Sequence, residues 1–219
     1  MHPLVKRYPI NTAGRDFIVG DIHGAFSLLL MAMDRVGFNP AADRLFCVGD
    51  LIDRGDESAR VAKFLAQSYV HAVCGNHEDM LMQLHPGDDL PDFQEDHWMV
   101  RRNGFGWWLK TSKEQRREIL NAVRTLPIVI EIDTPRGSVG VLHAEVPIGM
   151  SWSRFVTAIE NKDEKVTETA LWGRKRIESG DTDGVVGVGR VFVGHTPHWG
   201  GAKRFGNVFA VDTGAIFAE

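Results

Sequence analysis

The chain has few cysteines, no long apolar run and little net charge over its 219 residues. Its two cysteines, Cys47 and Cys74, are too few for a disulfide framework, so we expect both to be reduced thiols in buried strands. No stretch approaches the ~18 apolar residues of a membrane-spanning helix, and residues 1–15 lack the apolar core of a signal peptide. We therefore expect a cytoplasmic protein with no membrane partner.

The charge and composition exclude further classes of protein. A formal charge of −4 and a pI of about 6.1 leave no basic excess, so we expect no nucleic-acid partner. Hydrophobic residues make up 43% of the chain and charged residues 25%, which are ordinary values for a folded globular protein. Since no repeat or linker-like segment is evident, we expect residues 1–219 to form a single domain. The oligomeric state stays open.

Three short glycine-flanked turns each follow an apolar run that is typical of a buried strand. The turns are residues 20–24 (GDIHG), 49–55 (GDLIDRG) and 75–78 (GNHE). The ends of successive strands are where an α/β sheet builds a polar site. Carboxylate, amide and imidazole donors suit metals of the first transition row. The spacing therefore predicts a site for a pair of metal ions.

The elements around these turns predict an α/β fold. Strands alternate with helices expected at 26–36, 59–66 and 78–84, which favours a parallel sheet with right-handed crossovers. We expect Gly37 to end the first helix and Ser112 to open a capping box and a helix to about Arg124. The remaining expected elements are a strand pair at 127–132 and 138–142, a polar helical stretch at 151–177, a glycine-rich loop at 180–189 and strands at 191–193 and 208–211.

The middle of the chain has a different character. Residues 85–96 are acidic and broken by proline and glycine, so we expect an exposed loop there. Three tryptophans follow, and we expect all three to pack against the sheet: Trp98, Trp107 and Trp108.

Two more histidines follow predicted strands and complete a candidate set of metal ligands. They are His143 and His195, which join four residues of the glycine-flanked turns: Asp21, His23, Asp50 and Asn76. Each part alone has an ordinary explanation, since a single histidine after a strand is often structural and Asn76 can cap a helix. The coincidence of five strand ends favours a metal site. Within this set only Asp50 needs to bridge the two ions, and such a carboxylate offsets part of their charge.

These motifs resemble the phosphoprotein phosphatase branch of the calcineurin-like metallophosphoesterases, whose pattern is GDxHG, GDxxDRG, GNHE and two later histidines. The chain is most similar to the small bacteriophage lambda-type serine/threonine phosphatases. The resemblance extends to residues 97–98, 171–172, 194–197 and 211–215. It implies a central β-sandwich of mixed sheets flanked by helices.

The resemblance also implies a ligand scheme and a reaction. One ion is expected on Asp21, His23 and Asp50. The other is expected on Asp50 and three further residues: Asn76, His143 and His195. The implied cofactors are two divalent metal ions, manganese by family habit, with iron or zinc suited to the same donors. A hydroxide that bridges the ions is expected to attack phosphorus directly, without a phosphoenzyme.

Four further residues match catalytic and substrate-binding positions of the family. His77 matches the general acid that protonates the leaving alkoxide, and Asp53 matches the carboxylate that orients it. Arg54 and Arg174 match arginines that bind phosphate oxygens. An acidic neighbour of Arg54 is an alternative partner for it, and Arg174 lies in a basic stretch that can simply be solvated. The implied substrates are phosphoproteins or phosphopeptides carrying phosphoserine or phosphothreonine, with phosphotyrosine and phosphohistidine as extensions.

The chain departs from the family pattern at Cys74, where an arginine usually precedes the GNHE turn. The missing guanidinium has two explanations that the sequence leaves open. Arg101, Arg102 or Lys175 compensates for it, or the site prefers substrates with less negative charge, such as diesters. A redox role for the Cys74 thiol is a minor alternative.

Two other functions share part of this pattern. A symmetrical dinucleoside tetraphosphate hydrolase, or a phosphodiesterase, has the same glycine-flanked turns. A catalytically inactive binding module could keep the metal for stability alone, but such a module would be expected to have lost His77, Asp53 or Arg54. The presence of all three favours an enzyme.

Overall fold

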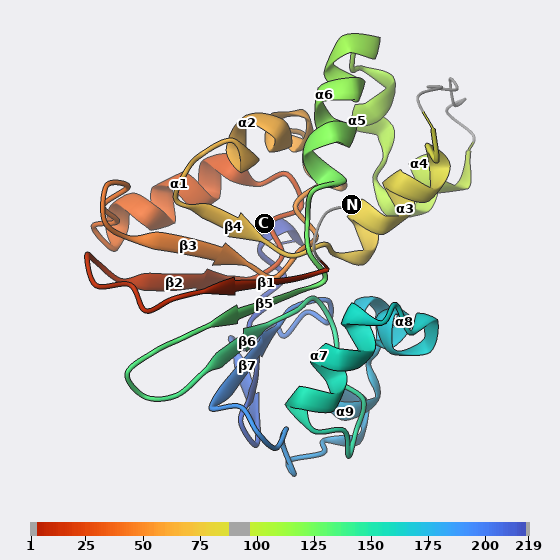
Figure 1. Ribbon diagram of the computed structural model, residues 1–219. Helices are drawn as coiled ribbons and strands as arrows, with labels where there is room; N and C mark the ends of the chain where they lie inside the picture. Colours follow the sequence, from red (N-terminus) through yellow and green to blue (C-terminus); the bar gives the residue numbers. More distant parts are fainter. Residues whose placement is uncertain (1–3, 88–96, 218–219) are drawn as a thin grey trace.

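Two β-sheets packed face to face form the centre of the computed structural model, which describes residues 4–87 and 97–217 (Figure 1). The smaller sheet has three parallel strands in the order β2-β3-β4, which are β2 (Asp16–Val19), β3 (Arg44–Cys47) and β4 (Val70–Ala72). The larger sheet has six strands in the order β1-β5-β6-β7-β9-β8. Their bounds are β1 (Val5–Tyr8), β5 (Val129–Ile132), β6 (Val139–Val141), β7 (Arg190–Val193), β8 (Lys203–Phe205) and β9 (Val208–Ala210).

The larger sheet is mixed, because two of its neighbouring pairs run antiparallel. Strands β5 and β6 form the expected antiparallel pair, and β8 pairs antiparallel with β9, while the other neighbours are parallel. The sequence analysis missed β1 and β8. Both lie at an edge of the sheet, and each buries a single side chain, Val5 in β1 and Phe205 in β8. Such edge strands lack the apolar pattern by which a strand is recognised.

The core between the sheets follows from the alternation of side chains along each strand. In β3, Phe46 points to the larger sheet, while Leu45 and Cys47 pack under the helices on the other face. The intersheet core is made by apolar side chains of both sheets: Phe46, Val48, Val73, Ile130, Ile132, Val139 and Val141. The expected β-sandwich is therefore confirmed, with a mixed larger sheet and a parallel smaller sheet.

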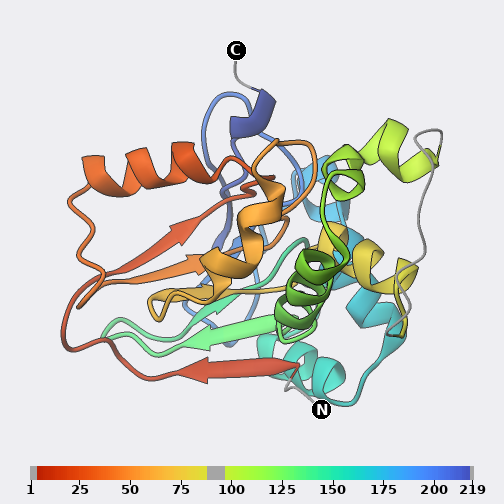
Figure 2. The same cartoon turned by 90° about the horizontal axis from the view of Figure 1, so that it is seen from above.

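Helices cover the outer face of each sheet (Figures 1 and 2). Over the smaller sheet lie α1 (Phe26–Arg35), η1 (Ser58–Arg60), α2 (Val61–Leu65), α3 (Asn76–Leu84), α4 (Trp98–Asn103), α5 (Gly106–Leu109) and α6 (Lys113–Val123). Over the larger sheet lie α7 (Trp152–Glu160), α8 (Glu164–Trp172) and α9 (Lys175–Ser179). A short turn of helix, η2 (Ala215–Phe217), follows the last strand. Each set of helices closes its own apolar core, so the sandwich has three apolar layers.

Several local predictions are confirmed and others need correction. Gly37 follows α1 with a φ of +61°, and the Ser112 hydroxyl accepts the backbone N–H of Gln115 at 3.2 Å in the expected capping box. The expected helical stretch at 151–177 is divided into three helices. Asp163 caps the second through the backbone N–H of Val166, and the extended backbone of Gly173 ends it before α9 begins. Most of the expected acidic loop, residues 88–96, lies outside the described part of the chain.

Two side-chain environments also differ from expectation. Trp98 is 53% exposed, so its packing against the sheet was predicted wrongly, whereas Trp107 and Trp108 are buried. Both cysteines are buried and free, as expected, but Cys74 follows β4 instead of lying within it. Its thiol belongs to the core beneath α7 and α8.

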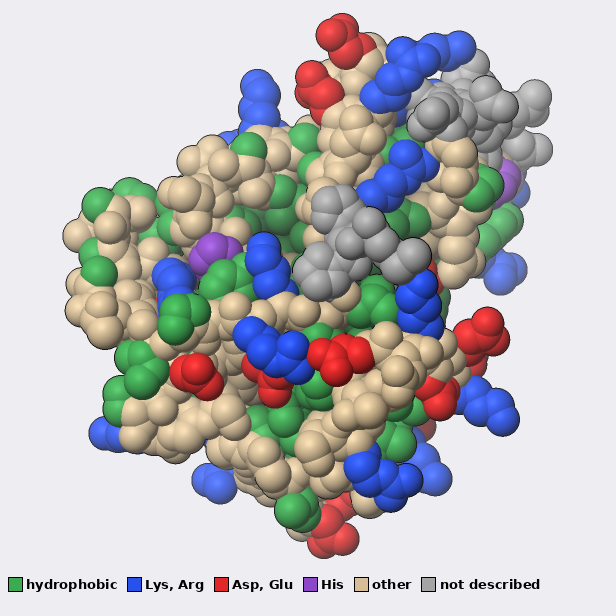
Figure 3. All heavy atoms as spheres, viewed as in Figure 1, with side chains coloured by type: hydrophobic (Ala, Val, Ile, Leu, Met, Phe, Trp, Pro, Cys, Tyr) green, Lys and Arg blue, Asp and Glu red, His purple; other side chains and the backbone are tan. Residues whose placement is uncertain are grey.

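The described surface mixes charges of both signs. Figure 3 shows basic and acidic side chains side by side across the middle of one face. Arg7, for example, lies 2.7 Å from a carboxylate oxygen of Glu131 and 2.9 Å from one of Glu160. Among the described residues, no helix has the length and apolar character needed to cross a membrane.

Candidate metal centre

All six predicted metal ligands follow the carboxyl ends of strands from both sheets, and all six are buried. The smaller sheet supplies Asp21 and His23 after β2, Asp50 after β3 and Asn76 after β4. The larger sheet supplies His143 after β6 and His195 after β7. Parallel strands bring their carboxyl ends to one edge of a sheet, and the sandwich brings the two edges together.

Asp50 lies between two groups of donor atoms. Its Oδ2 is 3.6 Å from Nε2 of His23, and its Oδ1 is 3.4 Å from Nε2 of His143. One group consists of His23, Asp50 and His77, whose ligand atoms all lie within 4.8 Å of one another. With His195, Asp50 and His143 form a second such group. One carboxylate thus joins two clusters, as a pair of neighbouring metal ions requires.

The imidazoles of His23 and His143 turn unprotonated nitrogens toward Asp50. Nδ1 of His23 lies 2.9 Å from the carbonyl oxygen of Ile52, and Nδ1 of His143 lies 2.8 Å from that of Val48. A carbonyl only accepts, so each Nδ1 carries the hydrogen. Burial lowers the pKa of His23 to about 3 and also lowers that of His143, which leaves both Nε2 atoms without a proton. Metal-binding histidines commonly have this arrangement.

A second observation shows that the donor set fits a cation. Nε2 of His143 and Oδ1 of Asn76 are 2.8 Å apart, although neither atom carries a hydrogen. Nδ1 of His195 lies 2.9 Å from the same Asn76 oxygen and 3.1 Å from the same His143 nitrogen. Lone pairs that face each other at this distance repel, and a divalent ion between them would replace the repulsion with coordination. The residues present therefore fit a metal.

Asp21 lies beside this group, and near it lies the carboxylate of Asp212, to which the sequence analysis gave no role. The carboxylate of Asp21 accepts the backbone N–H of His195 at 3.0 Å, and a side chain at Gly194 would place Cβ 2.0 Å from its Oδ1. Burial, and then the charges of Asp50 and Asp212, raise the pKa of Asp21 well above its usual value. Asp212 is itself 4% exposed. Three buried carboxylates so close together favour the binding of positive charge.

His77, which belongs to the first group, forms a close buried pair with Asp53. Nδ1 of His77 lies 2.6 Å from Oδ2 of Asp53, and its Nε2 lies 3.8 Å from Oδ2 of Asp50. Burial lowers the pKa of His77, but the carboxylates of Asp50 and Asp53 outweigh it, so the pKa is raised overall. The imidazole can therefore hold a proton that it could later donate.

The two predicted phosphate-binding arginines lie at opposite edges of the cluster. Nη1 of Arg54 is 2.6 Å from Nε2 of His23, and its Nη2 is 3.3 Å from Nε2 of His77. Arg174 is exposed and donates to the Thr196 hydroxyl at 3.3 Å. Burial lowers the pKa of His195 to about 3, with further contributions from His143 and Arg174. The positive charge of Arg174 is therefore close enough to affect the second group.

The acidic neighbours of Arg54 do not hold it in the structure. Glu57 instead pairs with Arg60 and accepts the backbone N–H of Ser27 at 2.7 Å. The guanidinium of Arg54 lies 5.2 Å from the centre of the Phe217 ring, which supports it from the other side. The guanidinium nitrogens of Arg54 therefore point to His23 and His77.

Glu78 ties two of the glycine-flanked turns together, a role that the sequence analysis missed. Its carboxylate accepts the backbone N–H of Asp50 at 2.9 Å, of Leu51 at 2.8 Å and of Gly75 at 2.8 Å. Burial, and then the charge of Asp50, raise its pKa to about 7. The signal was a glutamate three residues after a helix-capping position, since Gly75 precedes the first helical residue, Asn76.

Backbone strain concentrates at this centre. Among the described residues, the non-glycine residues with positive φ are Lys162 and five members of the site: His23, Asp50, Asp53, Arg54 and His195. Such conformations are costly for residues with a side chain and cluster at functional sites. Close contact between turns contributes, because a Cβ at Gly75 would lie 2.3 Å from the Asp50 nitrogen. The turns are therefore held in place by their neighbours, not by local preference.

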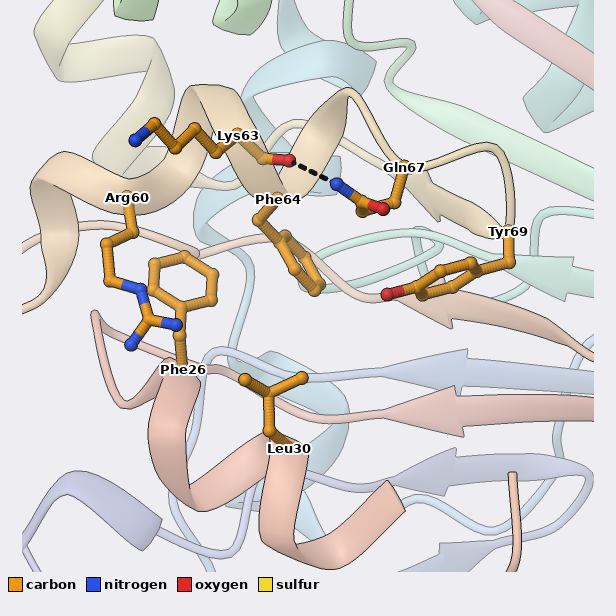
Figure 4. A pocket seen from close by; sticks show the side chains of 7 residues that line it. All are labelled: Phe26, Leu30, Arg60, Lys63, Phe64, Gln67 and Tyr69. Carbon is orange, nitrogen blue, oxygen red and sulfur yellow. Dashed lines mark hydrogen bonds between the residues drawn. The ribbon is translucent and has the colours of Figure 1, made fainter. Parts of the chain in front are cut away.

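Two pockets give further context. One of about 590 Å³ lies beside the site and is lined in part by Arg54, Trp107 and Lys110. Another of about 180 Å³ lies between α1 and α2, where the rings of Phe26 and Phe64 approach each other (Figure 4). None of the predicted site residues lines the second pocket. The second pocket is therefore separate from the strand-end cluster.

Comparisons with known proteins agree with this geometry. The model of the calcineurin-like phosphoesterase family matches residues 17–212. The chain is 32% identical over 208 residues to serine/threonine-protein phosphatase 1 of Salmonella typhimurium, which covers 92% of this chain and 87% of that relative. A symmetrical bis(5'-nucleosyl)-tetraphosphatase of Shewanella frigidimarina is 31% identical over 153 residues, which cover 69% of this chain and 50% of that relative.

A comparison with solved structures finds a similar fold in a phosphatase. A protein serine/threonine phosphatase from Saccharomyces cerevisiae superposes with a TM-score of 0.62 at 17% identity, over 96% of this chain and 71% of that chain. At this level of identity the likeness concerns the fold alone.

Proposed function

We propose that this chain, which belongs to the calcineurin-like phosphoesterase family, is a metal-dependent phosphatase that removes phosphate from serine and threonine side chains of proteins. The observation that carries the proposal is the position of Asp50 between two groups of potential metal donors, the first of which includes His77 in its pair with Asp53. A metal site alone suits many reactions. A protonated imidazole and an arginine beside it suit the cleavage of a phosphate ester in particular.

The resemblance to the family suggests how the metal ligands divide between two ions. We propose that one divalent ion is held by Asp21, His23 and Asp50, and the other by Asp50, Asn76, His143 and His195. When bound, the two ions supply Lewis-acid charge to the phosphate and a nucleophilic water. We propose manganese as the native metal, although iron and zinc suit the same donors.

The chain's own groups perform the remaining steps. A phosphoserine leaves as a strongly basic alkoxide, so its oxygen needs a proton as the ester bond breaks. His77 would donate that proton from Nε2, because its Nδ1 is held by Asp53 at 2.6 Å. Arg54 and Arg174 would bind phosphate oxygens from the two edges of the cluster, where planar guanidinium groups match the charge that develops in the transition state.

Two further points belong to the same proposal. We propose that residues 1–219 form one metallophosphoesterase domain, because both sheets contribute ligands to the same cluster. We also propose that the protein acts in the cytoplasm, where the free buried thiols of Cys47 and Cys74 would stay reduced.

The test is turnover by protein that has been stripped of metal and refilled with manganese, iron or zinc. The substrates are matched peptides that carry phosphoserine, phosphothreonine, phosphotyrosine or phosphohistidine. We expect manganese to restore the highest kcat/KM, with phosphoserine and phosphothreonine peptides preferred. Absence of phosphopeptide hydrolysis with all three metals would overturn the proposal.

A second candidate is hydrolysis of symmetrical dinucleoside tetraphosphates. It is favoured by the 31% identity to the Shewanella frigidimarina tetraphosphatase over 69% of this chain. Diadenosine tetraphosphate, assayed beside the phosphopeptides with the same metal, separates the two functions. A higher kcat/KM on the dinucleotide would replace the first proposal with the second.

A further inference from the structure

The indole of Trp107 extends the His77–Asp53 pair by one residue. Its Nε1 lies 2.6 Å from Oδ1 of Asp53, while Oδ2 of the same carboxylate lies 2.6 Å from Nδ1 of His77. An indole N–H can only donate, so Trp107 is the donor and Asp53 the acceptor. Each oxygen of the carboxylate is thus held from a different side.

The surroundings make this contact important for the geometry of the pair. Asp53 is fully buried and Trp107 is 7% exposed, so little water can replace either partner. The backbone of Asp53 has a φ of +70°, which local preference does not support. The carboxylate therefore depends on its tertiary contacts for its orientation.

The segment that carries Trp107 is itself fastened to the turn that carries Asp53. The carbonyl oxygen of Gly104 accepts the backbone N–H of Arg54 at 3.1 Å, and a Cβ at Gly104 would lie 2.5 Å from Cα of Arg54. Gly104 has a φ of +73° and ends α4, and α5 with its indole follows directly. The loop thus holds Asp53 and Arg54 at once.

We infer that Trp107 is a positioning residue, which fixes the Asp53 carboxylate so that His77 can protonate the leaving oxygen of the substrate. This inference rests on the proposed phosphatase function, because it assigns no chemistry to the indole itself. Trp107 acts through Asp53, and Asp53 acts through His77. The loss of Trp107 should therefore matter only where a proton must be delivered.

Trp108 offers a matched control within the same short helix. It is fully buried, yet its Nε1 has no hydrogen-bond partner among the described residues. Trp107→Phe and Trp108→Phe each remove one buried indole. The first removes a hydrogen bond to Asp53, and the second removes none. A difference between the two variants therefore reports on the hydrogen bond and not on the loss of ring volume.

The experiment compares two leaving groups. A phosphoserine peptide needs a proton on its leaving oxygen, whereas 2,4-dinitrophenyl phosphate releases a stable phenolate. For Trp107→Phe we expect kcat on the peptide to fall by about 10–100-fold, as for other residues that orient a catalytic group. On the dinitrophenyl ester we expect a change of less than about twofold. For Trp108→Phe we expect both rates to stay within about twofold of the wild type.

A double-mutant cycle and a spectroscopic measurement complete the test. In an Asp53→Asn background, Trp107→Phe should have no further selective effect on the peptide. In wild-type protein, the indole N–H proton of Trp107 should resonate far downfield, and Asp53→Asn should move it upfield without moving that of Trp108. The spectroscopic result does not require Trp107→Phe to fold.

The outcomes separate this inference from the proposed function. If the wild-type protein hydrolyses neither ester, the proposed function fails. If the wild type is active but Trp107→Phe slows both esters equally, Trp107 is structural and the inference fails. An indole resonance of Trp107 that Asp53→Asn leaves unmoved overturns it as well.

Discussion

The two sheets contribute to the metal centre in different ways. The smaller sheet supplies Asp21, His23, Asp50 and Asn76 from three turns that follow consecutive strands, together with the pair of His77 and Asp53. The larger sheet supplies two imidazoles, His143 and His195, which stand 52 residues apart in the chain. In the proposed function, the residues of the smaller sheet combine metal binding with proton transfer by His77 and phosphate binding by Arg54. The second half holds metal donors and, at its edge, Arg174.

This difference suggests that the two sheets have different roles in the site. The smaller sheet builds a reacting site that is rich in hydrogen bonds and strained backbone, including the positive φ of His23, Asp50, Asp53 and Arg54. The larger sheet closes that site with two imidazoles that lie against Oδ1 of Asn76, Nε2 of His143 at 2.8 Å and Nδ1 of His195 at 2.9 Å. Asp50 is the point where the halves meet. Substitutions in each half should therefore fail in different ways.

Asp50→Asn should have the largest effect because Asp50 belongs to both groups of metal donors. The amide cannot bridge two cations, so we expect both ions to be lost. We expect kcat/KM to fall by more than about 10³-fold, beyond the cost of one electrostatic contact in an active site. The measurements are metal content by elemental analysis and turnover of a phosphoserine peptide.

Asp43→Asn is the control for this substitution. Asp43 is also a buried carboxylate, but it accepts hydrogen bonds from Arg15 and from the Asn39 backbone, away from the centre. We expect its kcat/KM to match the wild type. Retention of two ions by Asp50→Asn would contradict the bridging role.

His77→Asn and His143→Asn should separate proton transfer from metal binding. We expect His77→Asn to keep its metal and to lose about 10²–10⁴-fold in kcat on a phosphoserine peptide, as the removal of a general acid does. His143→Asn should lose metal first, with activity recovering partly at high metal concentration. Equal metal loss in both variants would place His77 among the ligands. An unchanged kcat for His77→Asn would mean that the leaving oxygen needs no proton from His77.

The smaller sheet's half could be predicted from the sequence because its motifs are local. A strand, a glycine and a polar donor follow one another within a few residues, so the turns around Asp21 and Asp50 are visible in one dimension. His143 and His195 could be found in the same way, because each follows a predicted strand. The α/β alternation was also local. The edge strands β1 and β8 were missed because each has only one buried side chain.

The contacts that hold the site in place are long-range, and no local pattern encodes them. Trp107 reaches Asp53 across 54 residues, and its ring was expected only to pack against the sheet. Glu78 reaches the Asp50 turn across 28 residues. The positive φ of Arg54 also depends on its neighbours, in particular on close contact with Gly104. Such features follow from tertiary packing, which overrides local preference.

Cys74→Arg tests the one departure from the family pattern. The thiol is 1% exposed and lies in the core beneath α7 and α8, where its Sγ donates to the Gly75 carbonyl at 3.3 Å. A guanidinium there would be a buried, unpaired charge, so we expect the free energy of unfolding to fall by about 3 kcal/mol. Urea unfolding measures this.

Cys74→Met separates size from charge, because it has a similar reach without the charge. We expect it to lose less stability than Cys74→Arg. An arginine variant with unchanged stability and a lower KM for phosphomonoesters than for diesters would contradict this prediction. It would mean that the guanidinium reaches the substrate and that its absence shapes specificity.

Glu78→Gln and Glu145→Gln compare one buried glutamate near each sheet, and we expect their effects to be the smallest of those predicted. Both glutamates are buried and accept a backbone N–H at the start of a helix. The structure gives Glu145 one such donor, the N–H of Arg176 at 2.8 Å, so a glutamine oxygen can replace it. Glu78 uses both oxygens for several N–H groups, and the amide of a glutamine would face donors with a donor.

We therefore expect Glu78→Gln to lower the free energy of unfolding by about 2 kcal/mol and Glu145→Gln by less than about 1 kcal/mol. Urea unfolding with a chelator present measures the difference without a contribution from bound metal. Equal losses would mean that the turns of the smaller sheet do not rely on Glu78. The strain at Asp50 would then have to be supported by its other contacts, among them the close approach of Gly75 and the backbone N–H groups of Ile22 and His23 that donate to its carbonyl oxygen.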